Sequence, residues 1–417
     1  MNDAAASSPK IRFPQFSDNW EEKRGGDAFT SRRERGKKGL PIYSVTIDRG
    51  MVRRDTLERE FTNGSDEEAN LRAERDDIVY NMMRMWQGAA GRAPEHCMVS
   101  PAYVVLSPKS ATSSHFFEYW FKRARSIYWL WAYSHGLTDD RLRLYFRDFE
   151  RVPMRLPQLP EQRRIAEFLE AVSCRIDLLR QRRDALIRYK KGAMQQIFAR
   201  TVRFARADGS TFPDWTPFKL GDVFEWVSTN NLSREMLVDE GGSIQNIHYG
   251  DIHGKFAVRF KQDEAKAPFI RRDAKISPFR DEAYCRPGDV IIADASEDYA
   301  DVGKAIEIVE VRPRSLVSGL HTLIARPKEG MLAVGFAGYI FQTHRLRGQI
   351  MRIAQGISVL SVSRSSLSKL TIDVPHFDEQ RKISDLLGAL DDKIDALSAQ
   401  VSAMQSFKTG LLQQMFV

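Results

Sequence analysis

Cysteine is scarce in this chain of 417 residues, and the three that occur are widely separated. Cys97, Cys174 and Cys285 form no CxxC pair, so their spacing provides neither a disulfide framework nor a zinc site. We interpret them as small apolar side chains, mostly buried, in a protein of a reducing compartment.

Long apolar runs are absent too. No stretch of about eighteen uncharged apolar residues occurs, which excludes a typical transmembrane helix. The opening segment MNDAAASSPK has no basic part followed by an apolar core, as a secretory signal would have. Together these two absences predict a cytoplasmic location.

The motifs of common active sites are missing as well. The sequence contains no GxxxxGK[ST], GxGxxG or HExxH motif, and no Asn-Pro-Pro-Tyr or Asn-Pro-Pro-Phe expected of a base-amino methyltransferase. Asp289, Asp294 and Glu307 resemble part of a nuclease carboxylate set, but this fragment lacks the Glu-x-Lys of such a site. We therefore expect no catalytic residues, no metal site and no cofactor in this chain.

The net charge and the length of the chain exclude fewer classes of protein than these absences do. Sixty-three Lys and Arg against fifty-five Asp and Glu give a net charge of +8, which allows a polyanionic partner without demanding one. Apolar residues make up 42% of the chain, as in folded globular proteins. A chain of this length predicts two or more domains, each with its own core.

The most informative feature is a long segment that occurs twice. Residues 161–198 and 379–416 align without gaps at an offset of 218 and share fifteen of thirty-eight residues. The shared residues include Glu161/Glu379, Gln162/Gln380 and Phe198/Phe416. A repeat of this length indicates that a whole structural unit was duplicated.

Each copy predicts a long helix, because apolar residues recur in steps of three and four. Such a helix is about 55 Å long, and pairing of the two copies in an antiparallel coiled coil would bury both apolar faces. The alternative is that each helix packs on its own neighbouring domain. Gly192 and Gly410 could loosen or end the helices. The residues expected to mediate helix pairing and partner docking are Ile165, Leu169, Ile176, Leu179, Ile383, Leu387, Ile394 and Leu397.

The regions before the helices form a weaker repeat. Trp20, Gly26, Asp27 and Phe29 match Trp215, Gly221, Asp222 and Phe224 at an offset of 195. Short apolar runs such as DDIVYN, AYVVLSP, GDVIIAD and HTLIARPK predict strands, and apolar helices are expected near 116–133 and 337–353. The predicted fold is α+β, with α/β domains at 1–155 and 201–373, helices within 156–200 and 374–417, and an internal pseudo-two-fold repeat.

Basic and amide side chains gather in loops of both domains. SRRERGKK follows the first Trp segment, STNNLSRE occupies the equivalent position in the second domain, and NMMRMWQGAAGR precedes a glycine-rich turn. Such side chains can neutralise phosphates or pair with base edges in the major groove. There are simpler interpretations. SRRERGKK could be a solvated charged loop, and NMMRMWQGAAGR could be a turn that packs Trp86 into the core. The candidate DNA-binding residues are Arg32, Arg33, Lys37, Lys38, Arg84, Gln87, Asn230, Asn231 and Arg234.

The sequence resembles the DNA-specificity subunit of Type I restriction-modification systems. The resemblance rests on LPQLPEQRRIAEFLEAV and VPHFDEQRKISDLLGAL, on the KGxxQQIF-like helix ends, and on the variable domain before each helix. It implies two target-recognition domains that read the halves of a split, asymmetric double-stranded DNA site. It also implies two methyltransferase subunits and a restriction subunit with translocase activity as partners, which would supply S-adenosylmethionine, ATP and magnesium chemistry.

Two other classes of function stay open from sequence alone. A coiled-coil adaptor without sequence-specific DNA binding would carry its basic charge incidentally. A self-contained nuclease or methyltransferase would be active as a single chain with magnesium or S-adenosylmethionine.

Overall fold

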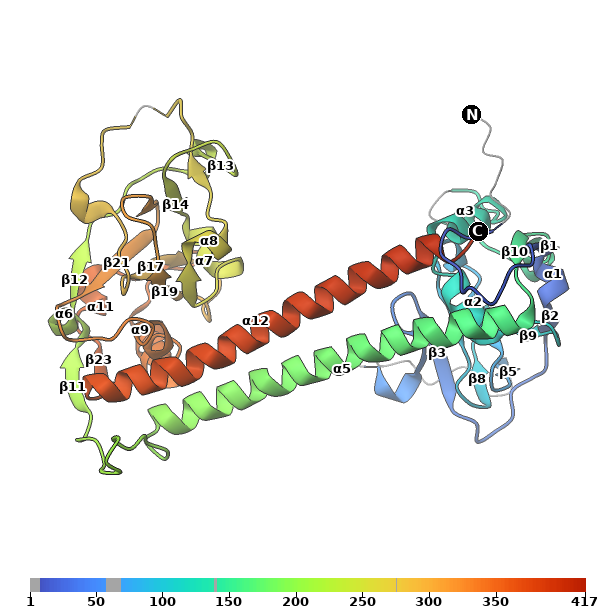
Figure 1. Ribbon diagram of the computed structural model, residues 1–417, viewed down its shortest axis with the longest axis horizontal. Coiled ribbons are helices and arrows are strands. Elements are labelled where there is room, and N and C mark those ends of the chain that lie inside the picture. Colours follow the sequence, from blue (N-terminus) through green and yellow to red (C-terminus); the bar gives the residue numbers. More distant parts are fainter. Residues whose placement is uncertain (1–7, 58–68, 139–140, 275) are drawn as a thin grey trace. The chain divides into compact units, whose positions relative to one another are not determined.

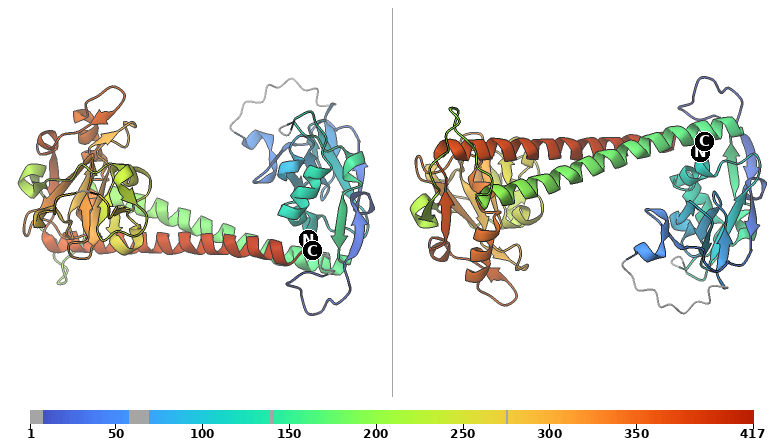
Figure 2. Two further views of the ribbon diagram at one scale, coloured as in Figure 1. Left: turned by 90° about the horizontal axis from the view of Figure 1, so that it is seen from above. Right: turned by 90° about the horizontal axis from the view of Figure 1, so that it is seen from below.

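The computed structural model describes residues 8–57, 69–138, 141–274 and 276–417. The chain divides into two compact units: the described residues up to Gln181 together with Ser398–Val417, and the described residues of Arg182–Leu397. Two long helices, α5 (Leu159–Phe198) and α12 (Phe377–Gln414), each contribute one half to each unit (Figure 1). Each unit thus contains the start of one helix and the end of the other, and the two helices run antiparallel (Figure 2).

The α+β fold with paired antiparallel helices and an internal repeat is confirmed. Both helices continue through their glycines to Phe198 and Gln414, so the expectation that Gly192 and Gly410 could end them was wrong. A Cβ at Gly192 would meet no atom within 4 Å, and only a side-chain amide would lie near one at Gly410. These glycines therefore sit on open helix surface and lower helix propensity without ending the helix.

The first unit contains two four-stranded sheets, with orders β2-β9-β6-β7 and β4-β3-β8-β5, and an antiparallel pair β1-β10. Its strands are β1 (Glu21–Arg24), β2 (Phe29–Arg32), β3 (Ile42–Thr46), β4 (Gly50–Arg53), β5 (Leu71–Ala73), β6 (Ile78–Asn81), β7 (Ala90–Arg92), β8 (Cys97–Val99), β9 (Tyr103–Pro108) and β10 (Pro153–Leu156). Its shorter helices are α1 (Gly25–Ala28), η1 (Arg54–Thr56), η3 (Met85–Gln87), α2 (Ser114–Trp120), α3 (Ala124–Ala132) and α4 (Phe146–Phe149).

The second unit has a five-stranded sheet of order β12-β21-β17-β19-β15, a four-stranded sheet of order β13-β16-β14-β20, and two strand pairs, β11-β23 and β18-β22. Its strands are β11 (Thr216–Lys219), β12 (Phe224–Val227), β13 (Leu237–Val238), β14 (Gln245–Ile247), β15 (Arg259–Lys261), β16 (Phe269–Ile270), β17 (Val290–Ala293), β18 (Ala295–Ser296), β19 (Ala305–Glu310), β20 (Leu316–Ser318), β21 (Thr322–Pro327), β22 (Leu360–Ser361) and β23 (Thr371–Val374). Its shorter helices are α6 (Leu220–Val223), η4 (Arg234–Met236), α7 (Tyr249–Gly254), α8 (Gln262–Ala265), η5 (Asp281–Ala283), α9 (Ala337–Ile340), α10 (His344–Ile353) and α11 (Arg364–Leu367).

The four apolar runs expected as strands form β6, β9, β17 and β21. Each apolar helix expected between sheet and long helix is instead two helices, α2 and α3 in the first unit and α9 and α10 in the second. The break lies at Arg123 and Thr343, whose backbones are extended (ψ 142° and 140°). The spacing of apolar residues does not reveal a short break between two consecutive helices, so the sequence predicted one helix in each unit.

A buried carboxylate fixes the start of each long helix to its domain. Glu161 receives both Nε and Nη2 of Arg12 at 2.7 Å, and the indole Nε1 of Trp20 at 3.3 Å. In the second unit, Glu379 receives Nε and Nη2 of Arg203 at 3.1 and 2.9 Å, and Trp215 Nε1 at 3.1 Å. We call these two arrangements the helix-start contacts.

The neighbouring glutamines anchor the same helix ends to a loop. Gln162 Oε1 accepts the N–H of Ser113, just before α2, and Gln380 Oε1 accepts the N–H of Ala333, just before α9. Their amide groups donate to the carbonyls of Pro157 and Pro375. The paired Glu-Gln therefore holds the Trp segment, the loop and the helix together in each copy.

The end of the other helix packs on the same tryptophan. Phe416, just after α12, lies edge-on to Trp20 and beside Phe116, with ring centroids 6.3 and 5.0 Å apart. Phe198, the last residue of α5, contacts Trp215 at 5.9 Å and Phe336 at 6.0 Å. Each domain consequently contacts the start of one long helix and the end of the other.

One buried acid in the second unit has no acidic counterpart in the first. Glu307 on β19 accepts the N–H groups of Gly335 and Gly338 at 2.5 and 2.7 Å, just before and within α9. Burial raises its pKa to about 7, although the two backbone N–H groups act in the opposite direction. At the equivalent strand position the first unit has Arg92, paired with Glu118.

We predict that Glu161→Gln lowers the free energy of unfolding by about 2–3 kcal/mol, because the guanidinium of Arg12 loses its carboxylate partner in a largely buried position. Urea unfolding followed by tryptophan fluorescence measures this. The matched control is Glu167→Gln on the same helix, whose exposed carboxylate lies 3.5 Å from Arg164 and should contribute less than about 0.5 kcal/mol. Equal losses in the two variants would contradict a stabilising helix-start contact.

The raised pKa of Glu307 predicts a pH dependence of stability. Its pKa in the folded domain lies above the ordinary value of 4.5, so its contribution to stability is complete below about pH 4.5 and declines as pH rises through about 7. Wild type should lose about 2–3 kcal/mol from this group over that range. Glu307→Gln should show a flatter profile in urea titrations at several pH values; parallel profiles would refute the assignment.

Candidate functional site

The basic loop of the first domain contains one ion-paired arginine and several exposed cations. Arg32, at the end of β2, donates from Nε to Asp77 and from Nη1 to Glu34, both at 2.8 Å. Arg33, Lys37 and Lys38 lie exposed in the connection between β2 and β3. The three exposed side chains are thus available to a polyanion, whereas Arg32 already has two carboxylate partners within its domain.

Arg32 is bound within its domain because it compensates the charge of a buried aspartate, Asp77, whose counterpart in the second domain is Asp289. Both are buried, and burial raises the pKa of Asp77 although the Arg32 guanidinium opposes the shift. In the second domain the arginine comes from a different strand: Arg326 on β21 donates two bonds of 2.8 Å to Asp289. The strand pairings β2–β9 and β12–β21 show which residues correspond. Ser107 of the first domain occupies the position of Arg326, and Val227 of the second domain occupies the position of Arg32. Each domain thus has one arginine that compensates its buried aspartate. In the first domain this arginine is on the edge strand β2, and in the second it is on β21, the neighbour of the edge strand β12.

The other candidates of the first domain lie on the turn that contains η3. Arg84 is exposed, and its Nη1 lies 3.4 Å from the side-chain oxygen of Gln87. Trp86 is half-buried and donates its indole N–H to the carbonyl of Met83. The tryptophan therefore shapes the turn, and the Arg84 and Gln87 side chains are presented beside each other on its surface.

In the equivalent loop of the second domain, some polar side chains are hydrogen-bonded within the domain and others are exposed. Asn230 donates to Asn246 Oδ1 at 2.8 Å and accepts the N–H of Leu232, so both ends of its amide are used internally. Asn231 is exposed, and Arg234 pairs with Asp251 at 2.6 Å. Among these three candidates, Asn231 has the side chain most available to a ligand.

The helix residues expected to mediate pairing are buried, with Ile394 half-buried. In the second unit Ile383 and Leu387 belong to one core with Phe336 and Ile340, so this part of α12 packs on its domain as well as along α5. The ion pair Lys190–Asp391, 2.5 Å long, joins the two helices there, and Tyr339 donates to the same aspartate. Both modes of packing considered from sequence are combined in this unit.

The carboxylates that resembled part of a nuclease site do not form one. Asp289 is engaged by Arg326, Asp294 lies beside His321, and Glu307 caps the segment around α9. Across the described ranges no group of three or more His, Cys, Asp or Glu side chains is arranged to hold a metal ion. No helix within these ranges is long and apolar enough to cross a bilayer.

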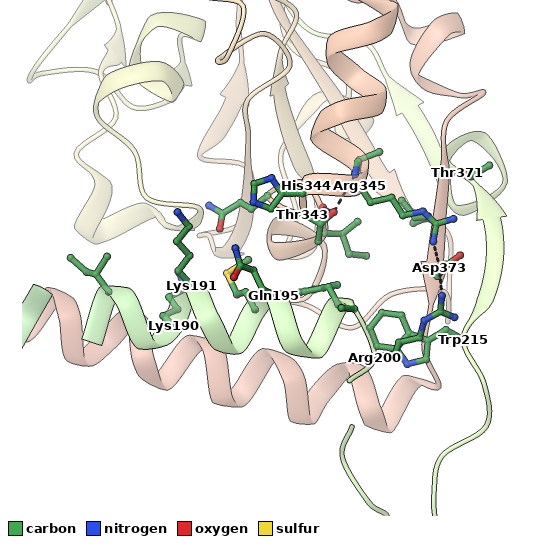
Figure 3. A pocket seen from close by; sticks show the side chains of 18 residues that line it. Lys190, Lys191, Gln195, Arg200, Trp215, Thr343, His344, Arg345, Thr371 and Asp373 are labelled. Carbon is green, nitrogen blue, oxygen red and sulfur yellow. Dashed lines mark hydrogen bonds and ion pairs between the residues drawn. The ribbon is translucent and has the colours of Figure 1, made fainter. Parts of the chain in front are cut away.

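A cavity of the second unit lies between the last turns of α5 and helix α10, and has a volume of about 810 Å³. Figure 3 shows Arg200, beyond α5, and Arg345, on α10, both directed at Asp373 of β23. The Arg200–Asp373 distance is 3.4 Å. The one acidic residue of this cavity is therefore compensated by two arginines.

The chain matches the model of the Type I restriction modification DNA specificity domain twice, over residues 18–188 and 213–403. Two curated relatives come from Methanocaldococcus jannaschii. The putative type I restriction enzyme MjaX specificity subunit is 23% identical over 52% of this chain and 49% of the relative, and the MjaVIII specificity subunit is 20% identical over 63% and 61%. The aligned regions thus span about half to three fifths of these relatives.

Solved structures share the fold. The Type I restriction-modification S subunit from M. genitalium has a TM-score of 0.59 at 15% identity, covering 98% of this chain and 99% of its own. A chain from a study of complex assembly and conformational transition of the type I R-M system has a TM-score of 0.54 at 17% identity, covering 96% and 98%. With two matches that together include most of its residues, the chain belongs to the Type I restriction modification DNA specificity domain family.

Proposed function

We propose that this chain is the sequence-specific DNA-binding subunit of a Type I restriction-modification complex. The single observation that carries the proposal is that the chain contains two matches to a DNA specificity domain, each fixed to both long helices by the same contacts. The two domains share their core fold and their helix contacts but differ in their loops. This supports two domains that recognise different DNA sequences. The target would then be asymmetric and in two parts.

The distribution of free and internally bound polar side chains supports this reading. Arg33, Lys37 and Lys38 in the first domain and Asn231 in the second are exposed on loops that differ between the copies. Cations of this kind contact phosphates, and amides such as that of Asn231 can pair with adenine in the major groove. Arg32 and Asn230 are used within their domains, which favours a positioning role for them.

The long helices would set the distance between the half-sites. A helix of 40 residues such as α5 is about 60 Å long, close to two turns of B-DNA. Large apolar side chains remain exposed along it, at Leu178, Ile187 and Tyr189, and Phe407 is half exposed on α12. Such side chains are suited to docking methyltransferase subunits, which is the role we assign to this surface.

Catalysis would then reside in the partners. Methyltransferase subunits would bind S-adenosylmethionine, restriction subunits would use ATP and magnesium, and this chain would supply recognition alone. The complete complex would act on DNA in the cytoplasm.

Mapping of methylated motifs in cells that carry the complete system tests the proposal. Wild type should give one motif with two unlike halves and an unread gap. Inserting seven residues after Gln181 and seven after Leu397 lengthens both helices by about 10 Å, so the gap should grow by about three base pairs with the halves unchanged. An undivided motif would overturn the proposal, and a constant gap would refute the role of the helices.

Asn231→Ala should weaken specific binding by about 1–3 kcal/mol and non-specific binding far less, because a base contact carries sequence information and a phosphate contact does not. Filter binding of target and scrambled duplexes by the assembled methyltransferase complex measures both. The adjacent Asn230→Ala is the matched control, expected to lower thermal stability because Asn246 and Leu232 lose their partner. Equal losses for both duplexes with Asn231→Ala would reassign Asn231 to phosphate contact.

A further inference from the structure

Both domains present a large aliphatic side chain entirely to solvent at the same place in their fold. Leu137 follows α3 and Ile357 follows α10, and each is 102% exposed. Among the described residues the next most exposed large apolar side chain, Tyr189, is 61% exposed. The domain cores therefore do not require Leu or Ile at these positions.

The sequence around these two residues is alike where the preceding sequence is not. Residues 136–138 read Gly-Leu-Thr and residues 356–358 read Gly-Ile-Ser, at an offset of 220. Residues 126–135 and 346–355, which come before them, share no residue at this offset. A pattern of glycine, aliphatic and hydroxyl residues that persists in exposed loops of diverged domains indicates a task common to both. We call residues 136–138 and 356–358 the loop tips.

Backbone hydrogen bonds close the loop beneath each tip. His135 and Arg143 exchange two N–H···O bonds of 2.9 Å below the first tip, and Gln355 and Ser361 exchange bonds of 3.0 and 2.8 Å below the second. A Cβ on the glycine of either tip would collide with a carbonyl oxygen across the loop, so glycine allows the tight closure. Each aliphatic side chain is thus carried on a closed loop.

The same bond fixes both loops to the end of a central strand. The N–H of Leu144 donates to the carbonyl of Met82 at 3.0 Å, just after β6. The N–H of Val362 donates to the carbonyl of Asp294 at 2.9 Å, just after β17, the counterpart of β6. The loop tips therefore occupy equivalent places in the two domains.

These strand ends also lead to the candidate DNA-binding side chains. In the first domain, the turn after β6 contains Arg84 and Gln87. In the second, Asp294 lies 3.3 Å from His321 in the connection between β20 and β21, and the end of β20 bonds to the loop that contains Asn231. A DNA molecule bound by these side chains would be close to the loop tip of the same domain.

Polar side chains beside the tips favour DNA over a protein as the partner. Arg141 and Arg143 are exposed on either side of the buried Leu142, and Ser361 is exposed beside the buried Val362. Arginine and serine both contact phosphate oxygens in DNA complexes. DNA combines charged phosphates with apolar stacked bases, and so its chemistry matches an aliphatic side chain flanked by such groups.

We propose that Leu137 and Ile357 insert into the base stack of DNA, one in each half-site. Leucine and isoleucine are among the side chains that enter between base steps. A base that is to be methylated must leave the stack to reach an active site, and the inserted side chain would fill the space that it leaves. This inference rests on the proposed function and extends it, because it assigns these residues to base unstacking and not to sequence reading.

Base unstacking by the assembled methyltransferase complex tests the proposal. The probe is the target duplex found by motif mapping, with 2-aminopurine beside the methylated base of one half-site, since its fluorescence rises when it unstacks. Leu137→Ala should lower the fluorescence gain and the methylation rate about tenfold in one half-site only, and Ile357→Ala in the other. Each variant is the matched control for the other. Because both side chains are fully exposed, neither change should alter the melting temperature.

A pyrene nucleotide opposite the methylated base separates insertion from other roles. Pyrene fills the space of a base pair, so it displaces the base and replaces the missing side chain. Each variant should therefore methylate its half-site of the pyrene duplex at the wild-type rate. A defect that pyrene does not restore, unstacking equal to wild type, or loss of methyltransferase subunits from the variant complex would overturn the proposal. Wild type without specific binding to the target duplex would instead overturn the proposed function itself.

Discussion

A charged hydrogen bond between a buried glutamate and a tryptophan–arginine pair underlies the whole arrangement of this protein. Glu161 and Glu379 begin the two long helices, and each receives an indole N–H and a bidentate guanidinium from the segment that opens its domain. Without these contacts, each domain would be linked to its helix by the bonds of the neighbouring glutamine and by apolar packing, which has little directional preference. The orientation of a recognition domain on its helix therefore depends on a few polar atoms.

The same tryptophan also contacts the end of the other helix, through Phe416 in one domain and Phe198 in the other. Each domain thereby holds one helix start and one helix end, which accounts for the antiparallel pairing. The apolar residues of the helices then have two tasks: Leu387 packs within a domain core, whereas side chains such as Tyr189 are exposed and form the surface that we propose for partner docking. Helical periodicity in sequence does not distinguish these tasks, because burial by a domain and burial by a helix follow the same spacing.

Much of the fold could be predicted because it is repeated. The two long helices and the four strands β6, β9, β17 and β21 followed from periodicity and from matches between the halves. The role of Glu161 could not, since a glutamate in a first helical turn is explained equally well by the helix dipole. The persistence of both Trp20/Trp215 and Glu161/Glu379 between diverged halves was the available signal for their contact. The loop candidates were chosen by residue type, which cannot separate Arg32, paired with a buried aspartate, from the exposed Lys37 nearby.

The alternative placement of one arginine has an evolutionary consequence. Asp77 is compensated by Arg32 on β2, and Asp289 by Arg326 on β21. These strands are not counterparts of each other: β2 corresponds to β12 and β9 to β21, and the two strands are neighbours in the sheet of each unit. A hybrid domain that joined the edge strand of one copy to the neighbouring strand of the other would therefore contain either two arginines or none beside its aspartate. Recombination among such genes should succeed when crossovers fall within the long helices, where the contacts are alike, and fail when they fall between these strands. New specificities would then arise by exchange of intact domains.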